Sequence, residues 1–301
     1  MHFPDNEDAR SRVALAVAIA SVSTAAIMIR ICDSGPLTVA FYRLLFTTLM
    51  VMPWALAKDM DCFKGISPRE WAKLAGIGLV LAVHFSLWVS SVGMTSVANS
   101  AVLVTMHPIF VAAIAFIALN ERTSRSALIG AGIAFAGVAI MFAGGLSGGG
   151  LAGDVLAVGG AVAAAFYIIG GRSQRKKLRT GAYCLIVYGF ATLFIAPLAY
   201  MESGFVPASG NDWYVFVLMA VVAGVLGHTM YNYALGRVSA FFVSTTLLGE
   251  PIISSILAWA LLSEVPSKWT FVGAPLVLVG ILLSAGMGGW LMKKGAPDAA
   301  R

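Results

Sequence analysis

Ionisable side chains stand inside several long apolar runs of this sequence, namely His84, His107, His228 and Glu250. On membrane-insertion scales a charged residue at the centre of a helix costs about 2.5–3.5 kcal/mol. Each such group is therefore expected either to pair with another group or to serve a function. Histidine titrates near neutral pH and can bind a carboxylate or relay a proton. We therefore predict that these four residues form the polar centre of a substrate or proton site. An interhelical hydrogen bond is the structural alternative for each of them.

Aromatic and amide side chains accompany these groups and are predicted to line the same site. Trp88 follows His84 by four residues, which places both on one face of a helix. Tyr167 and Asn232 lie inside later apolar runs and suit the side chain and polar head groups of an amino acid. Ser244 is a further candidate for substrate binding, although such residues often bond to their own helix backbone. Ordinary packing is the alternative for the aromatic residues.

Neither a metal site nor a cofactor is predicted. The histidines and Glu250 form no pair with the i, i+3 or i, i+4 spacing of a helical metal site, and the three cysteines are widely spaced. The phosphate-binding pattern G-x-x-x-x-G-K-[ST] is absent from the sequence, so ATP is not expected to drive the protein directly.

One motif points to a different class of protein. The segment Gly145–Gly149 matches the G-x-S-x-G pattern around a nucleophilic serine, so an intramembrane hydrolase that uses Ser147 is the alternative. The stretch Gly144–Gly153 contains six glycines, which a flexible connection between two halves explains without chemistry. We therefore predict that the protein is not an enzyme.

The elements that carry these residues follow from composition. The chain of 301 residues is 59% hydrophobic and 11% charged, whereas soluble domains carry about 25% charged residues. A water-soluble enzyme is thereby excluded, and continuous apolar runs of about 20 residues predict an all-α membrane protein with ten transmembrane helices. The predicted helices are Val13–Ile31, Pro36–Ala57, Leu74–Val92, Ser96–Leu119, Ala127–Leu146, Asp154–Gly171, Ala182–Met201, Trp213–Leu235, Ser239–Leu262 and Trp269–Met292.

Lysine and arginine set the expected orientation. Of the 20 Lys and Arg residues, all but Arg30, Arg43 and Lys268 fall on the side that holds the N-terminus once the ten helices are placed. Positive residues gather on the cytoplasmic side of a membrane. We therefore predict a multi-pass protein of the bacterial inner membrane with both termini in the cytoplasm. The net charge of +6 belongs to this pattern and does not indicate nucleic-acid binding.

Small residues spaced four apart are expected to bring helices close together. The pairs are Gly130 with Ala134, Gly132 with Ala136, and Ala223 with Gly227. Such faces let two helix backbones approach each other in a membrane, so we predict a compact bundle.

The chain contains an internal repeat. A shift of 143 residues aligns Gly93–Met141 with Gly236–Ser284 and matches 11 of 49 positions, including Pro108 with Pro251 and Glu121 with Glu264. The shift spans five helices, so the second half must cross the membrane in the opposite sense. We predict two inverted five-helix repeats, residues 1–146 and 147–301, which is an architecture of secondary transporters with a central site.

Proline follows two of the polar groups, at Pro108 and Pro251. Proline removes one backbone donor and frees the carbonyl four residues earlier, here that of Val104 and that of Leu247. Exposed backbone polarity at this depth is tolerable only against protein or a water-filled cavity. We predict bends at both prolines, which would act as hinges beside the site.

Three further charged residues are assigned structural or gating roles. Glu121 and Glu264 fall at helix C-termini, where an acid opposes the helix dipole, so another contact should hold each of them. Arg43 lies inside the second helix and is expected to reach outward or to pair with Asp33, with a substrate carboxylate as the alternative partner.

The segments Pro108–Glu121 and Pro251–Glu264 resemble the paired signature of the EamA-type drug/metabolite transporter family. The resemblance covers the whole chain and is strongest to the bacterial aromatic amino-acid exporters of the YddG type. It implies a cavity lined mainly by helices 1, 3, 4, 6, 8 and 9, with helices 5 and 10 at the periphery. His107 departs from the acidic residue that is common at its position in the family.

These observations predict a secondary transporter that exports amino acids or similar small zwitterionic metabolites by alternating access. Its expected partners are these solutes and the lipid bilayer, and not ATP or nucleic acid. Two energy sources stay open: a proton gradient acting through the histidines and Glu250, or downhill movement of the substrate without protons. Export of other drugs or metabolites by the same architecture is the alternative within the family.

Overall fold

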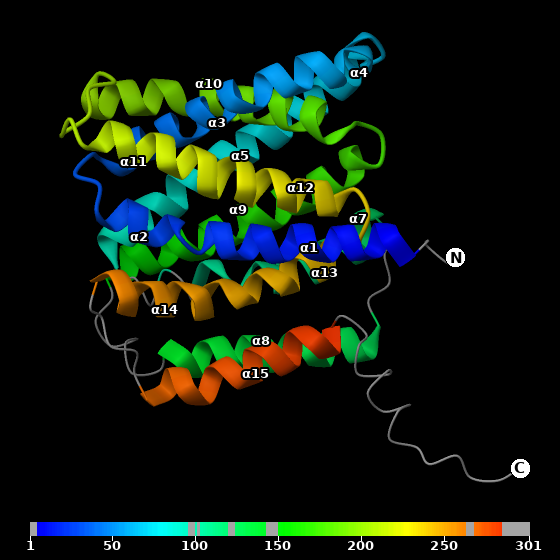
Figure 1. Ribbon diagram of the computed structural model, residues 1–301, viewed down its shortest axis with the longest axis vertical. Coiled ribbons are helices and arrows are strands. Elements are labelled where there is room, and N and C mark those ends of the chain that lie inside the picture. The colour runs from blue at the N-terminus through cyan, green and yellow to red at the C-terminus, as the bar shows by residue number, and fades with distance from the viewer. Residues whose placement is uncertain are drawn as a thin grey trace, which may run out of the picture.

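The structure is a computed structural model that describes residues 5–95, 100, 103–119, 124–142, 150–262 and 268–284. Every regular element among these residues is a helix (Figure 1). Seven of the helices are long and apolar enough to cross a membrane, and three shorter apolar helices accompany them, at His107–Ala118, Arg125–Met141 and Lys268–Ser284. The predicted class of an all-helical membrane protein is therefore confirmed for the described part of the chain.

Several predicted spans are divided into shorter elements. The first half of the chain contains α1 (Asp5–Val22), α2 (Ala25–Arg30), α3 (Pro36–Lys58), α4 (Met60–Lys64), α5 (Pro68–Met94), α7 (His107–Leu119) and α8 (Arg125–Phe142). The second half contains α9 (Leu151–Arg175), α10 (Thr180–Ser203), α11 (Asp212–Met219), the π-helix η2 (Ala220–Thr229), α12 (Met230–Leu235), α13 (Ala240–Thr246), the 3₁₀-helix η3 (Leu247–Gly249), α14 (Glu250–Leu262) and α15 (Lys268–Ser284).

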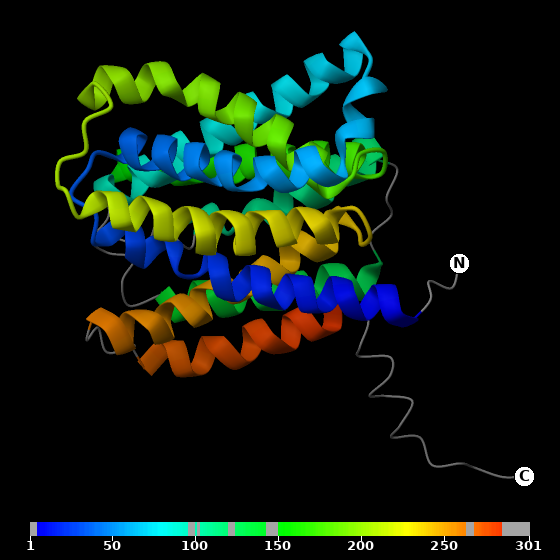
Figure 2. The same cartoon turned by 45° about the horizontal axis from the view of Figure 1, so that its top comes forward.

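The helices run side by side across the molecule. In Figure 1, α3 and α10 form one edge and α8 and α15 form the opposite edge, with α9 and α12 between them. Figure 2 shows from another angle that α8 and α15 stay together at the edge away from α10. The pairs α8–α15, α5–α9 and α3–α10 pack directly against each other. This arrangement puts α5, α9 and α12 in the interior, where they can enclose a site.

Glycines make the contact between α8 and α15 unusually close. A Cβ atom added to Gly130 would lie 2.6 Å from the carbonyl oxygen of Gly280, and one added to Gly137 would lie 2.7 Å from that of Gly273. The 143-residue repeat pairs Gly130 with Gly273 and Gly137 with Gly280. The contact is therefore reciprocal and antiparallel, as in two helices related by a two-fold axis.

The small-residue prediction is confirmed for two of the three pairs. Ala134 meets Gly280 within the same contact, and a Cβ at Gly227 would lie 2.8 Å from Val22. Gly132 and Ala136 are exposed, and nothing lies within 4 Å of a Cβ added to Gly132. This third pair was wrongly predicted to pack, because spacing alone does not say which helix face meets a neighbour.

A carboxylate from α10 caps the start of α3. The Glu202 carboxylate accepts hydrogen bonds from the backbone N–H of Leu37 (3.2 Å) and of Thr38 (2.7 Å). The first N–H groups of a helix have no partner within the helix, and a negative charge suits this end of the helix dipole. A Cβ at Gly35 would lie 2.5 Å from the Glu202 carboxyl carbon, so a larger residue there would displace this carboxylate from the helix end.

The substitution Glu202→Ala is expected to lower the free energy of unfolding by about 0.5–2 kcal/mol, the usual cost of a lost helix cap. The measurement is the midpoint of thermal unfolding of the purified protein in detergent. Glu202→Gln, whose amide oxygen still accepts a hydrogen bond, should retain part of the stability. An unchanged midpoint for the alanine variant would contradict this role of Glu202.

Candidate functional site

A cavity lies among the central helices and comprises about 650 Å³ of space not filled by atoms, counting the part open to solvent. It is lined by residues of α1, α2, α3, α5, α7, α9, η2, α12, η3 and α14 and by the segment before α7. Six of the sequence-predicted site residues lie on its wall: His84, Trp88, His107, Tyr167, His228 and Glu250. Residues up to 166 positions apart in the chain are thus brought together at one place.

The predicted helices that contain Pro108 and Pro251 are both interrupted at the cavity. The residues Thr105 and Met106 form a turn before α7 starts at His107, and the 3₁₀-helix η3 precedes α14. Val104 and Leu247, whose carbonyls lose their usual donor to proline, both line the cavity. The prolines themselves, Pro108 and Pro251, are buried. The structure thus interrupts both helices immediately before their prolines, at the places where the sequence predicts bends.

The first predicted span, Val13–Ile31, is also interrupted, which the sequence did not predict. A turn at Ser23 and Thr24 separates α1 from α2, and the flanking residues Val22 and Ala25 line the cavity. The Ser23 hydroxyl donates to the carbonyl of Ile19 (2.6 Å), and Thr24 does the same to Ser21 (2.7 Å). Such bonds compete with the helical pattern of backbone bonds and mark the break.

A ten-residue π-helix, η2, carries His228 to the cavity. The wider turn of a π-helix changes which residues face a given direction, and such segments occur often at functional sites. The predicted continuous span Trp213–Leu235 is therefore composed of α11, η2 and α12. Tyr231, three residues beyond His228, also lines the cavity.

Aromatic rings form much of the wall. The imidazole of His84 stacks on Trp88 with a centroid distance of 6.2 Å and an interplanar angle of 5°. The His228 ring lies 5.3 Å from the Phe85 ring and 5.8 Å from the Tyr231 ring, measured between centroids. His84 Nδ1 forms a 2.9 Å hydrogen bond with the carbonyl of Gly160, which fixes its ring. The wall therefore consists mainly of aromatic ring surfaces, among which a few isolated polar atoms occur.

Asn232 and Ser244 do not line the cavity. The Asn232 amide donates to the hydroxyls of Tyr167 (2.7 Å) and Tyr188 (2.9 Å), so it lies behind the wall and positions Tyr167. Ser244 is buried and donates to the carbonyl of Phe241 at 2.8 Å. Asn232 therefore holds the cavity residue Tyr167 in place from behind. Ser244 bonds to its own helix backbone, which was the alternative to substrate binding.

Arg43 lies on the cavity wall, although the sequence favoured a structural role away from it. Its guanidinium carbon lies 4.5 Å from the centroid of the Phe85 ring and 5.9 Å from that of Trp88. The residue is 2% exposed, which excludes the expected outward reach to the membrane surface. Helix α3 is consequently a cavity helix. The length of the apolar run predicts that Arg43 lies inside the membrane but not which way its side chain points.

The remaining predicted residues lie outside the described part of the chain. They are Glu121, Glu264 and the alternative nucleophile Ser147, together with the predicted boundary between residues 146 and 147. Within the described residues, no group of three or more His, Cys, Asp or Glu side chains has the arrangement of a metal site.

Known proteins resemble this chain over most of its length. An uncharacterized transporter from Archaeoglobus fulgidus is 27% identical over 90% of this chain and 95% of its own. A probable terminal-alkyne amino-acid exporter from Streptantibioticus cattleyicolor is 23% identical over 62% of this chain and 63% of its own. One crystal structure superimposes with a TM-score of 0.76 at 17% identity and covers 93% of this chain and 98% of that one, which supports the fold.

The family model for EamA-like transporters matches the chain twice, at residues 12–143 and 151–286. The two matches fall on the two halves that the internal repeat predicts and leave few residues of the chain uncovered. The matched segments contain every residue that lines the cavity. The chain therefore belongs to the EamA-like transporter family.

Proposed function

We propose that the protein is a secondary transporter that exports amino acids, aromatic ones included, or similar small zwitterions. The observation that carries the proposal is the cavity, in which Glu250, Arg43 and the three histidines lie among aromatic rings in the middle of apolar helices. A solute with charged groups and an apolar body suits this lining. The relative that is a probable amino-acid exporter supports the same substrate class.

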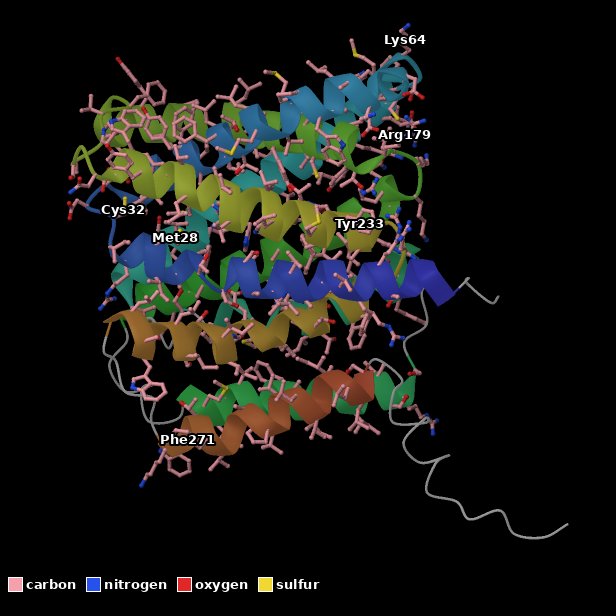
Figure 3. All side chains as sticks on the ribbon, viewed as in Figure 1. Met28, Cys32, Lys64, Arg179, Tyr233 and Phe271 are labelled. Atoms are coloured by element: carbon pink, nitrogen blue, oxygen red, sulfur yellow. The ribbon has the colours of Figure 1, made fainter. Side chains whose placement is uncertain are left out.

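The proposed topology has ten membrane spans with both termini in the cytoplasm of a bacterial inner-membrane protein. The seven long helices and the three shorter apolar ones supply ten apolar segments. Lys64 and Arg179 lie at the end of the bundle where the N-terminus emerges, whereas Cys32 and Phe271 lie toward the opposite end (Figure 3). Because positive residues gather on the cytoplasmic side, this distribution supports the proposed orientation.

The two halves, residues 1–146 and 147–301, are proposed to cross the membrane in opposite senses. The reciprocal antiparallel contact between α8 and α15 supports this arrangement, because equivalent helices of inverted halves must run in opposite directions. The double match of the family model supports the division into halves.

Alternating access then needs a relative movement of the halves around the cavity. The interruptions at Ser23, before His107 and at η3 all lie beside the cavity, where helices can bend without breaking long runs of backbone hydrogen bonds. Pro108 and Pro251 are the proposed hinges. This movement would expose the same charged groups first to one side of the membrane and then to the other.

Counterflow into proteoliposomes tests the proposal. Vesicles loaded with unlabelled L-phenylalanine, L-leucine or L-threonine should transiently accumulate the same labelled amino acid, with a rate that saturates, whereas protein-free vesicles should not. Efflux from amino-acid-loaded cells that express the protein tests the direction of transport. A rate that rises linearly with concentration would indicate a channel, and the absence of exchange for every amino acid would overturn the substrate class.

A further inference from the structure

The cavity contains a permanent positive charge whose partner the protein itself does not fully supply. Arg43 lines the cavity and is 2% exposed, and its Nη1 atom is buried without a hydrogen-bond partner. A guanidinium group stays protonated in proteins and presents several N–H donors in a rigid, planar fork. Leaving such a donor unpaired in the interior costs free energy, so the site is built for an acceptor that arrives from outside.

The aromatic neighbours of Arg43 hold the guanidinium without satisfying its donors. The faces of Phe85 and Trp88 attract the positive charge, since the guanidinium carbon lies 4.5 Å and 5.9 Å from their centroids. The backbone carbonyl of Arg43 accepts a 2.6 Å hydrogen bond from Thr47, which packs tightly against Gly224 of η2. These contacts fix where the fork begins, and no described residue accepts a hydrogen bond from its Nη1 atom.

Glu250 provides the opposite charge in the same cavity. Among the described residues that line this cavity, Glu250 is the acidic one and Arg43 is the permanent cation. The two side chains come from different helices, α3 and α14, and no salt bridge joins them in the described structure. A cation and an anion that share a cavity without pairing can each bind one charged end of a zwitterion.

We propose that Arg43 binds the α-carboxylate of the transported amino acid, while Glu250 binds its α-ammonium group and the aromatic wall receives its side chain. This inference rests on the proposed function and names the groups that select the substrate. The guanidinium fork matches a carboxylate through two parallel N–H···O bonds, which a single charge on lysine does not reproduce. A solute that lacks either charged end would leave one buried group unpaired and would bind more weakly.

Three related compounds separate the two charges in a binding assay. L-Phenylalanine carries both, phenethylamine lacks the carboxylate, and 3-phenylpropionate lacks the ammonium group. Affinities are measured from the ligand-dependent rise in the thermal unfolding midpoint of the full-length protein in detergent. For the parent protein, L-phenylalanine should bind about 10- to 100-fold more tightly than either analogue, as expected for the loss of one charge-assisted hydrogen-bond pair.

The substitution Arg43→Gln should reduce the affinity for L-phenylalanine to that for phenethylamine and should leave phenethylamine binding unchanged. Arg43→Lys keeps the charge but not the fork and should give an intermediate affinity, which also provides a second variant should the glutamine variant not fold. Arg69→Gln makes the same exchange at an exposed position and should behave as the parent.

The results distinguish this inference from the proposed function. Parent-like binding of L-phenylalanine by both folded Arg43 variants, or an equal loss for all three compounds, would overturn the role of Arg43 while amino-acid counterflow by the parent still stood. A folded parent that neither binds nor exchanges any amino acid would overturn the proposed function itself. Loss of both Arg43 variants as misfolded protein would assign the residue to stability and would also overturn the inference.

Discussion

Replacing Gly137 with leucine is expected to destabilise the protein by more than about 3 kcal/mol, which exceeds the usual 1–3 kcal/mol for added bulk in a packed core. A Cβ at this position would lie 2.7 Å from the carbonyl oxygen of Gly273 and 2.7 Å from the backbone nitrogen of Val277. Both obstructing atoms belong to the backbone of α15, so no side-chain rotation relieves the clash. Helices in a membrane associate largely through such close packing, and the pair α8–α15 would separate.

Size-exclusion chromatography and thermal unfolding in detergent measure this effect. Gly132→Leu is the matched control, because it adds the same side chain to the same helix where nothing lies within 4 Å of the added Cβ. By the reciprocity of the contact, Gly273→Leu should resemble Gly137→Leu. Equal unfolding midpoints for Gly132→Leu and Gly137→Leu would show that the close contact of α8 with α15 does not support the fold.

The second large effect concerns transport. Glu250→Gln should lower the initial rate of L-phenylalanine counterflow at least about tenfold, because the amide keeps the shape of the side chain but loses the charge that binds an ammonium group. Glu250 is the acidic residue on the cavity wall of the described structure, at the first position of α14. The rate is normalised to the amount of folded, reconstituted protein.

Glu70→Gln is the corresponding control outside the cavity. Glu70 caps α5 and pairs with Lys177 at the surface, and such exposed pairs contribute little to stability. This variant should transport at nearly the parent rate. A Glu250→Gln protein that also transports within twofold of the parent would remove the carboxylate of Glu250 from substrate binding.

Apolar run length predicted the long helices well. The predicted span Pro36–Ala57 corresponds to α3 at Pro36–Lys58, and Ala182–Met201 corresponds to α10 at Thr180–Ser203. The thickness of the bilayer dictates these lengths, so composition alone reveals them. The break at Ser23 and the π-helix η2 escaped prediction, because neither changes the hydrophobicity of the run and neither contains proline.

The sequence predicts how deep the site residues lie in the membrane, but not which way all of their side chains point. His84, His107 and His228 fall near the middle of their runs, and the structure brings all three to the cavity. Asn232 follows His228 by four residues and would share its face in a regular α-helix, yet it points to Tyr188 behind the wall. The π-helix changes the helical register beside these residues, which a sequence pattern with a fixed period cannot represent.

The reciprocal glycine contact bears on how a chain of this kind can originate. In it, Gly130 meets Gly280 and Gly137 meets Gly273, so each half contributes the same complementary surface. A single half therefore already carries both sides of the junction. Two separate copies of an ancestral half-length polypeptide could associate around a two-fold axis through this surface, and a later gene duplication with fusion would have required no new interface.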